Sequence, residues 1–460
     1  MRVTQSLTCW RLAALLGALA LGSCATPPRD AVGGNHDDSA LNVSADRLIV
    51  VTVDNKTRPL IGEPGSTPHG YAATNSYTVG DNARAVTAAI AHDYGLREVR
   101  EWPIVPLKVQ CLVFALPPSA DREAVLRRLS ADGRVKLAQP LQLFSALGHG
   151  DLSNTPPAPR PDLRAAPVSG GPYNDPYYGL QHGFSEIDAA AAQQWSRGDG
   201  VNVAIIDTGV ATAHPDLEGR VAVSRNFVDE DTKAFQSDRH GTEVAGIIGA
   251  DANNGLGIVG IAPGVRLQIY KACEPVRPQS MEAVCNSFTL ARALGAAVDG
   301  HAQIVNLSLG GPADPLLTQL VTYGLQHGVI FVGAVPEDGS LDGFPLDISG
   351  VIAVDQVGRS ERIHGVLHAP GRDIVSTAPA GGYDFVTGSS FAAAHVTGAI
   401  ALLRAKAPSF TASSLQAVLE RTRMQQVGDS INICAALDAV QPGSQCMHSA
   451  RAVATATAAH

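Results

Sequence analysis

The chain has 460 residues, more than one ordinary domain needs, and this length predicts two or three folded units. A formal charge of −9 argues against a nucleic-acid binder and against a polybasic membrane binder. Apolar residues make up 45% of the chain, enough for a large core, and no run reaches the roughly 18 apolar residues of a membrane-spanning helix.

Residues 1–23 have the pattern of a bacterial export signal. An apolar run over residues 12–21 leads into Leu21-Gly22-Ser23-Cys24. This ending resembles a bacterial lipobox, which implies that Cys24 becomes the lipidated first residue of a membrane-anchored chain. Ala25 behind the cysteine favours the outer membrane. The alternative is cleavage after Ala20, which would release a soluble secreted protein.

Seven cysteines are present, two of them in or next to the export signal, and Cys111 stands alone. In an exported chain, the close spacing of the other four predicts disulfides rather than a metal site. Zinc would favour tighter C-x-x-C spacing, so no zinc site is expected. The predicted disulfides are Cys273–Cys285 and Cys434–Cys446.

After a polar tether over residues 24–46, residues 47–144 form the first predicted domain. Strand and helix patterns follow in the order β-α-β-β-α-β, which is the ferredoxin-like split βαβ arrangement of an α+β domain. The domain contains no cluster of histidine, serine or cysteine, so it is predicted to be a helper or an inhibitor. The predicted strands cover 48–53, 98–105, 109–116 and 134–144, and the predicted helices 84–94 and 121–131.

A proline-rich linker over residues 145–172 is the predicted site of proteolytic cleavage, and residues 442–460 are predicted to be a disordered tail. Between them, in residues 173–441, short apolar runs alternate with helix-like segments. This alternation predicts an α/β domain with a parallel sheet that helices cover on both faces. The apolar runs cover 201–206, 267–271, 304–309, 329–332 and 351–354.

Three short blocks in this domain carry chemically useful side chains. Asp207 follows an apolar strand, and the carboxyl ends of parallel strands are where sites form. His240 opens a helix rich in small residues, and Ser390 lies at the start of a long helix. The unpaired N–H groups and the positive dipole end of that helix suit the oxyanion formed when a serine attacks a carbonyl.

The three blocks resemble those of the subtilisin-like serine proteases, in which acid, histidine and serine follow one another in this order. Supporting matches are His214-Pro-Asp-Leu217, the stretch 255–263 and Asn306-Leu-Ser-Leu-Gly-Gly311. The resemblance implies a subtilisin-like catalytic domain over 173–441. It also implies that residues 47–144 are an inhibitory propeptide, which would make the chain a zymogen.

The expected reaction is endopeptidase cleavage of polypeptides. Ser390 would attack the peptide carbonyl, His240 would take and return the proton, and Asp207 would orient the imidazole. By the same resemblance, an extended substrate pairs with the backbone of Ser308, Leu309 and Gly310.

Structural roles are the main predictions for the polar residues near these blocks. His214 is expected to be a structural loop histidine, and His395 is expected to face the core. Ser389 either lends a hydroxyl to the site or caps the helix. No organic cofactor is implied. Calcium is common in the family, but its ligands cannot be assigned here, because Asp216 is equally well a turn residue.

One block departs from the family pattern. There, a strand ends in Gly-Asn, and the Asn amide donates a hydrogen bond to the oxyanion. Here Pro336 and Glu337 take those places. An ionised carboxylate only accepts hydrogen bonds. Pro336 should also narrow or reshape the primary specificity pocket.

Three interpretations of Glu337 stay open. Its carboxyl could be protonated by burial and by the neighbouring Asp338, and then act as a donor at acid pH. It could instead point to solvent, so that Ser389 or backbone N–H groups serve a slow, specialised protease. Thirdly, the chain could be catalytically impaired and keep the fold as a binding or scaffold protein.

Overall fold

The structure is a computed structural model that describes residues 38, 40–56, 80–147, 171–358, 363–424, 428–443 and 446. The export signal, Cys24, most of the predicted linker and most of the predicted tail lie outside the described residues. Within the described part of the chain, no helix is both long and apolar enough to cross a membrane.

The first domain is an antiparallel sheet of four strands in the order β2-β3-β1-β4, which confirms the predicted βαββαβ order. Its helices α2 and α3 pack on one face through a shared apolar core. A short helix, α1 (Ala40–Val43), precedes it. The elements are β1 (Leu48–Asp54), α2 (Asp81–Tyr94), β2 (Arg97–Ile104), β3 (Val109–Ala115), α3 (Arg122–Ser130) and β4 (Val135–Pro140).

Strand β1 is apolar along nearly its whole length because both of its faces are buried. Ile49 and Val51 face the core under α2 and α3. Leu48 and Val50 belong to a second apolar cluster, shared with helices α8 (Ser287–Asp299) and α9 (Pro315–Gln326) of the second domain. The free Cys111 on β3 lies in that second cluster. The outer face of this sheet is therefore a docking face for the second domain.

The strand predicted over residues 134–144 is two strands. β4 ends at Pro140, and the chain then leaves the first sheet to form β5 (Leu143–Ala146). β5 lies in a different sheet, of order β12-β5-β10-β9, whose other strands belong to the second domain. The prediction of a linker from residue 145 was therefore wrong for Ser145, Ala146 and Leu147.

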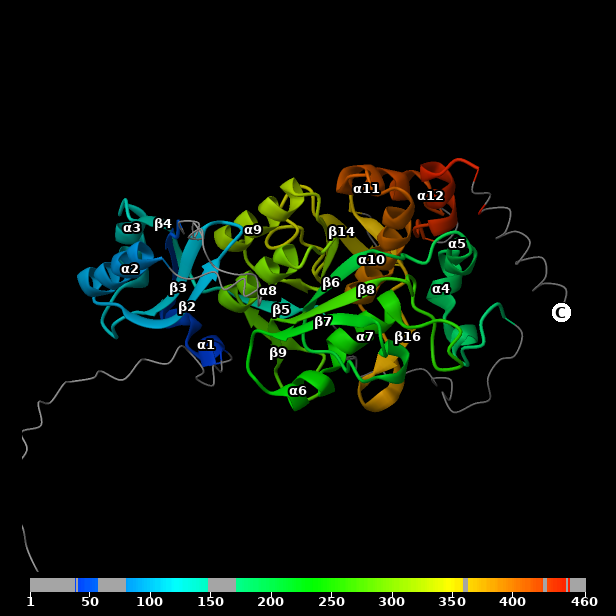
Figure 1. Ribbon diagram of the computed structural model, residues 1–460, viewed down its shortest axis with the longest axis horizontal. Coiled ribbons are helices and arrows are strands. Elements are labelled where there is room, and N and C mark those ends of the chain that lie inside the picture. Colours follow the sequence, from blue (N-terminus) through cyan, green and yellow to red (C-terminus); the bar gives the residue numbers. More distant parts are fainter. Residues whose placement is uncertain are drawn as a thin grey trace, which may run out of the picture. The chain divides into compact units, whose positions relative to one another are not determined.

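The second domain is built on a parallel sheet of seven strands in the order β15-β14-β13-β11-β6-β8-β7 (Figure 1). Every neighbouring pair is parallel. Each of the five apolar runs predicted as strands contributes a strand to this sheet, although the run over residues 304–309 ends in β12 of the other sheet. Its strands are β6 (Asn202–Asp207), β7 (Val221–Asn226), β8 (Arg266–Lys271), β11 (Ile304–Leu307), β13 (Ile330–Ala334), β14 (Ile352–Gln356) and β15 (Leu367–Ala369).

Helices cover both faces of this sheet, which confirms the predicted α/β class. Val203 and Ile205 of β6 pack in the same core as α7 (Arg239–Gly249) and α10 (Ser389–Lys406). The intervening Ala204 and Ile206 pack in the core of α8 (Ser287–Asp299) and α9 (Pro315–Gln326). The strands are nearly continuous apolar runs because alternate residues serve opposite cores.

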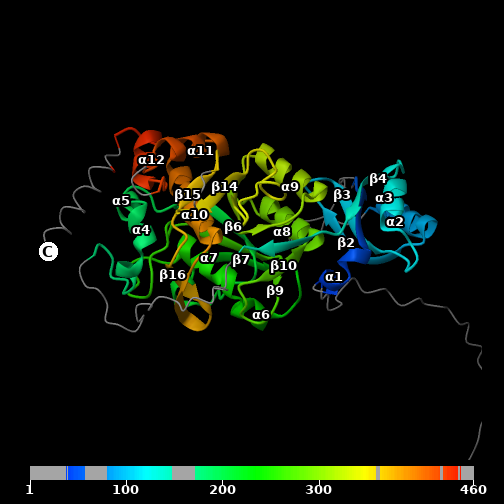
Figure 2. The same ribbon diagram turned by 180° about the vertical axis from the view of Figure 1, so that it is seen from behind.

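Smaller elements complete the domain (Figure 2). Both predicted disulfides are present, Cys273–Cys285 across a short hairpin and Cys434–Cys446 at the end of the chain. The remaining elements are α4 (His182–Glu186), α5 (Ala189–Gln193), α6 (Thr232–Ser237), β9 (Cys273–Pro275), β10 (Ala283–Asn286), β12 (Leu309–Gly310), β16 (Ile374–Ala378), β17 (Gly382–Val386), α11 (Ala412–Arg421) and α12 (Ile433–Val440).

Candidate active site

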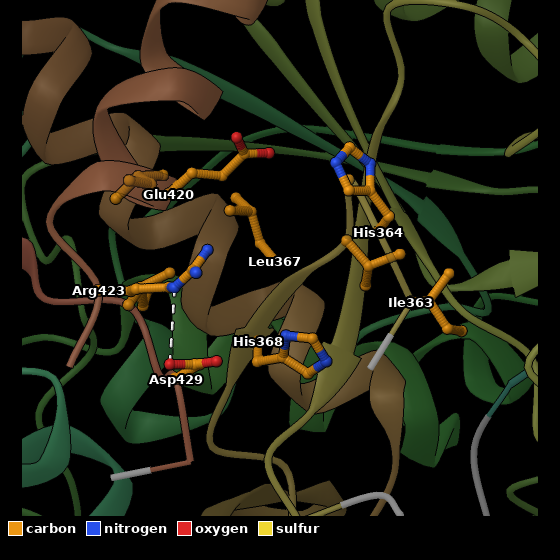
Figure 3. Close-up of a pocket in the computed structure, with 11 residues that line it drawn as sticks. Ile363, His364, Leu367, His368, Glu420, Arg423 and Asp429 are labelled. Carbon is orange, nitrogen blue, oxygen red and sulfur yellow. Dashed lines mark ion pairs between the residues drawn. The ribbon is translucent and has the colours of Figure 1, made fainter. Parts of the chain in front are cut away.

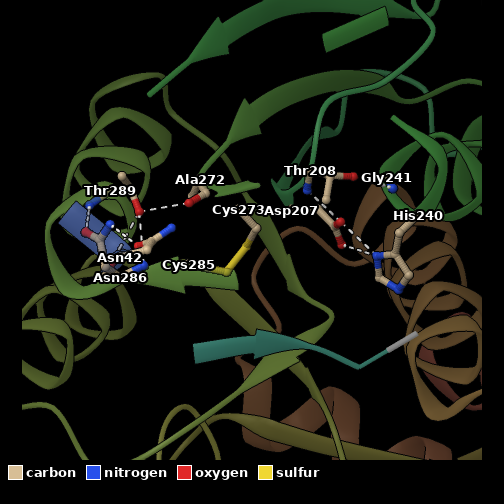
Figure 4. Close-up of a disulfide and its surroundings, with 10 residues drawn as sticks. All are labelled: Asn42, Asp207, Thr208, His240, Gly241, Ala272, Cys273, Cys285, Asn286 and Thr289. Atoms are coloured by element: carbon tan, nitrogen blue, oxygen red, sulfur yellow. Dashed lines mark hydrogen bonds and ion pairs between the residues drawn. A yellow bond between two sulfur atoms is a disulfide. The ribbon is translucent and has the colours of Figure 1, made fainter. Parts of the chain in front are cut away.

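Asp207 and His240 meet at the carboxyl end of the central sheet. Asp207 is the last residue of β6, and His240 lies in the first turn of α7. The imidazole Nδ1 lies 2.7 Å from Asp207 Oδ1 and 3.0 Å from Oδ2 (Figure 4). Thr208 N also donates to Asp207 Oδ1 at 2.6 Å, which fixes the carboxylate. Both side chains are buried.

The protonation of His240 depends on two opposing effects. Burial by itself lowers the pKa of the imidazole, but the charge and the hydrogen bond of Asp207 outweigh burial, and the pKa is raised above its ordinary value. This is the arrangement expected of a base whose protonated form is stabilised by a partner carboxylate.

Ser390 lies on the first turn of α10, which packs against α7. Its side chain is buried. Neither Ser390 Oγ nor His240 Nε2 has a hydrogen-bond partner among the described residues. The ring of the adjacent Phe391 lies 5.8 Å from the His240 ring, centroid to centroid. The structure thus brings the turn that carries Ser390 next to the His240 imidazole. The serine Oγ and the imidazole Nε2 are both buried and both without a hydrogen-bond partner among the described residues.

A second carboxyl group, Glu243, lies one helical turn after His240 and was missed by sequence reasoning. It is buried, and Arg239 Nε donates to its Oε1 at 2.6 Å. The same guanidinium donates to Asp384 on β17 at 2.6 Å. Burial raises the pKa of Glu243 to about 7, and Arg239 opposes that rise. The His240 block places this carboxyl one helical turn from the imidazole, but the burial of Glu243 comes from packing against segments remote in the chain.

Strand β5 lies between β12 and β10, in a space that we call the peptide groove. It is antiparallel to both, with Leu309 opposite Ala146 and Cys285 opposite Phe144. Leu147 N donates to Ser308 O at 2.9 Å. The predicted substrate-binding backbone is therefore paired with the end of the chain's own first domain.

The side chains of Phe144 and Leu147 both contact apolar residues of the second domain. Phe144 is buried, and its ring packs edge-on against Phe344 with centroids 5.6 Å apart. Gly311 is required there, because a Cβ on it would come within 2.4 Å of the Phe144 ring. Leu147 borders a cavity of about 350 Å³ that is also lined by Pro336. Pro336 therefore forms part of the wall of the cavity that Leu147 borders.

The carbonyl of Leu147 lies beside the turn that carries Ser390. A Cβ built on Gly388, whose φ of 153° is unusual for other residues, would be 3.4 Å from Leu147 O. Gly388 is the N-cap of α10, so this carbonyl lies near the N–H groups at the start of that helix.

The oxyanion region differs from both sequence interpretations of Ser389. Its hydroxyl donates to Val335 O at 2.6 Å and makes no helix-capping bond. Glu337 lies in the turn after β13 and is exposed. This exposure favours the second of the three interpretations, in which the Glu337 side chain faces solvent.

The two flanking histidines are structural, as predicted. His214 Nε2 lies 2.9 Å from Gly382 O, and its Nδ1 accepts from Asp216 N. His395 is buried with Nδ1 2.7 Å from Phe391 O, and burial lowers the pKa of His395 to about 4.

Asp175 is a residue that sequence reasoning missed and that could serve a cation. It is buried, and its Oδ1 has no partner among the described residues. Asn253 N donates to its Oδ2, while Asn254 Nδ2 and Ile258 N, from the same loop, donate to Asp216. Burial raises the pKa of Asp175, and the charge of Asp216 adds to that rise. Asp175 and Asp216 thus both bind the same loop through their carboxylates, and one buried carboxylate oxygen has no partner. Calcium prefers oxygen ligands of this kind. Among the described residues, no three or more His, Cys, Asp or Glu side chains are grouped so that they could hold a metal ion.

A cavity of about 390 Å³ lies apart from this site, between β15 and α11 (Figure 3). Arg423 Nε and Asp429 Oδ1 are paired at 3.5 Å on one side of it, and His364 and His368 lie in or next to β15. None of the residues that line it belongs to the triad or to the peptide groove.

Comparison with known proteins agrees with this geometry. Residues 198–433 match the model of the subtilase family of peptidases. The chain is 33% identical over 293 residues to a thermophilic serine proteinase from Bacillus sp. (strain AK1), which is 61% of this chain and 66% of that protein. It is 34% identical over 260 residues to thermitase from Thermoactinomyces vulgaris, which is 54% of this chain and 90% of thermitase.

A solved structure is also similar. Fervidolysin from Fervidobacterium pennivorans, described as a keratinolytic enzyme related to subtilisin, aligns with a TM-score of 0.64 and 24% identity. The alignment covers 86% of this chain and 61% of that chain. At this identity the likeness shows the fold alone.

Proposed function

The chain belongs to the subtilase family of serine endopeptidases, and we propose that it cleaves polypeptides through Asp207, His240 and Ser390. The observation that carries this proposal is the peptide groove, in which a strand of the chain itself is held with its last described carbonyl next to the Ser390 turn.

In the proposed reaction, Ser390 Oγ attacks the carbonyl carbon while His240 Nε2 takes its proton. Asp207 keeps Nδ1 protonated and stabilises the imidazolium. The N–H groups at the start of α10 bind the oxyanion. His240 then gives the proton to the leaving amine. In the second half of the reaction, water attacks the acyl-enzyme while His240 takes a proton from it, and His240 returns that proton to Ser390 Oγ as the acid leaves. The two unpartnered buried atoms, Ser390 Oγ and His240 Nε2, are the pair that this step requires.

The first domain acts as the inhibitor of this site. Besides β5, its Gln139 donates to Asp314 at 2.7 Å and accepts from Leu316 N at the start of α9. Asp38 forms ion pairs with Arg292 of α8 and with Arg100 of the first domain itself. These contacts hold the first domain on the second, so that β5 stays in the peptide groove after the chain is cut. We propose Leu147–Gly148 as the processing site, because the carbonyl of Leu147 lies beside Gly388, two residues before Ser390.

The chain is exported and anchored through Cys24, in this proposal. Because the anchor precedes the first domain, cleavage after Leu147 leaves the catalytic domain attached to the membrane only by the contacts with its inhibitor. Release of the inhibitor would then also release the protease.

Purified precursor is expected to cut itself and to react with a fluorophosphonate at Ser390. Mass spectrometry should find the probe on Ser390, and N-terminal sequencing should find a new chain that begins at Gly148. A precursor that neither processes nor labels at any pH from about 4 to 9 would contradict the proposed hydrolysis. Labelling with a cut elsewhere would contradict only the assignment of Leu147–Gly148.

We further propose that calcium binds at Asp175 and Asp216. Chelation is expected to lower the melting temperature of the processed enzyme by roughly 5 °C, since a ligand at about 100 times its Kd adds about 2.7 kcal/mol. Added calcium should restore the original melting temperature. The melting temperature of the Asp175→Asn variant should be the same with and without chelator. Equal melting temperatures of the wild-type enzyme in chelator and in calcium would contradict the site.

A further inference from the structure

We propose that the Cys273–Cys285 disulfide positions polypeptide substrates by holding β10 as the outer wall of the peptide groove. This inference rests on the proposed function, because β5 is taken to mark the path of a substrate. It gives the disulfide a role in the recognition of residues remote from the cut bond, separate from any general effect on stability.

The hairpin that contains the disulfide is small. β10 pairs with β9 over three residue pairs, ending with Cys285 opposite Cys273. The opposite edge of β10 is the one that pairs with β5. Once β5 has left, an isolated two-stranded hairpin of this length is at best marginally stable. Residues 276–279 at its tip are exposed. A covalent link across the two strands therefore matters most in the empty or substrate-bound enzyme.

The disulfide connects this wall to the catalytic centre. Lys271 of β8 lies in register with Asp207 of β6, and the next residue, Ala272, donates its N–H to Asp207 O at 2.9 Å. Cys273 follows directly. Figure 4 shows Cys273 and Cys285 bridging the backbone beside Asp207 to the strand that runs along β5. Through the disulfide, β10 is tied to the edge of the sheet that carries the catalytic acid.

The two walls of the groove serve different parts of the bound strand. β12 and Ser308 bind residues 145–147, which are next to the proposed cut. On the other wall, β10 pairs with residues 143–145, and the pairing continues one residue further at Ser287. Ser287 N donates to Gln142 O at 3.0 Å, and Gln142 N donates to Ser287 Oγ at 2.9 Å. Six residues before the cut are thus bound, and the more remote ones depend on β10.

One end of β10 has a separate anchor. Asn286 caps α8 by accepting from Phe288 N and Thr289 N, and Thr289 Oγ1 donates to Ala272 O at 2.8 Å (Figure 4). Loss of the disulfide should therefore loosen the wall without unfolding α8. The expected consequence is weaker binding of long substrates with the chemistry left intact.

The chain offers a matched control, because both disulfides join cysteines 12 residues apart. Removing either one should cost a similar unfolded-state loop entropy. The test compares Cys273→Ala/Cys285→Ala with Cys434→Ala/Cys446→Ala on two substrates. One contains Gln-Leu-Phe-Ser-Ala-Leu before the cut, as in residues 142–147, and the other contains only Ser-Ala-Leu.

We expect the first variant to raise KM for the long substrate about tenfold with kcat changed less than twofold. KM for the short substrate, which meets β10 only at Ser145, should change less than twofold. Tenfold corresponds to about 1.4 kcal/mol. The control variant should leave both substrates unchanged. Equal effects on long and short substrates, or no effect on either, would overturn the inference. Fluorophosphonate titration of Ser390 separates this failure from failure of the proposed hydrolysis, which would abolish labelling in the wild-type protein too.

If the first variant does not process, processed Cys434→Ala/Cys446→Ala enzyme can be assayed before and after reduction. Inhibition by the hexapeptide Gln-Leu-Phe-Ser-Ala-Leu should weaken about tenfold on reduction, while inhibition by Ser-Ala-Leu should not change. Unchanged inhibition by the hexapeptide would contradict the role of the disulfide.

Discussion

Replacing Ser390 by alanine is expected to leave the precursor uncut at Leu147–Gly148 and to lower the turnover of peptide substrates by about 10⁶-fold, a loss of the size measured for the corresponding change in a subtilisin. Alanine removes the only atom that can form the acyl-enzyme, whereas the groove and the N–H groups of α10 remain. Turnover can be measured on a peptide spanning residues 142–152 by mass spectrometry.

Two comparisons make this result specific. Asp207→Asn keeps a side chain of the same size but stabilises the wrong tautomer of His240, so a loss of about 10⁴-fold is expected. The Ser390→Ala precursor should also be cut in trans by active enzyme, which shows that the variant is folded and presents the same bond. A Ser390→Ala protein that still processes itself at an unchanged rate would end the assignment of Ser390 as the nucleophile.

Replacing Glu337 by asparagine is expected to raise turnover at neutral pH by about 10²-fold. Removing one oxyanion donor from a subtilisin lowered turnover by about 10²–10³-fold, and we expect a gain at the lower end of that range when a donor is added. Glu337 lies in the turn after β13, where the family has its donor, and an ionised carboxylate there can only accept. The amide would restore an N–H donor and remove a charge that opposes the oxyanion. The measurement is kcat/KM across pH on the same peptide.

The matched control is Asp338→Asn, which removes a neighbouring exposed charge without placing a donor at the family position. A gain with Glu337→Asn alone would identify the missing donor as the cause of slow turnover, and equal gains in both variants would identify the charge. No gain, with wild-type activity confined to about pH 4–5, would favour a protonated Glu337 that donates. No activity in any variant would favour the binding or scaffold protein.

Local patterns in the sequence were enough to predict most of the fold. The apolar runs of the central sheet, the helix that begins at Ser389, and the βαββαβ order of the first domain each depend on short stretches of chain. Both disulfides followed from a spacing of a dozen residues. The roles proposed for Asp207, His240 and Ser390 were also predicted from local motifs, because each residue stands at a strand end or a helix start.

Only the tertiary structure decided where the first domain ends and what it touches. Residues 143–147 alternate buried and exposed side chains, as a strand does, but their partners lie on β10 and β12, far along the chain. The burial of Glu243 and the unsatisfied oxygen of Asp175 also depend on segments remote in sequence. Periodicity and motifs report what a stretch of chain does by itself. Packing between distant segments determines that β5 lies in the groove and that the carboxyl groups of Glu243 and Asp175 are buried. No local pattern in the sequence encodes these contacts.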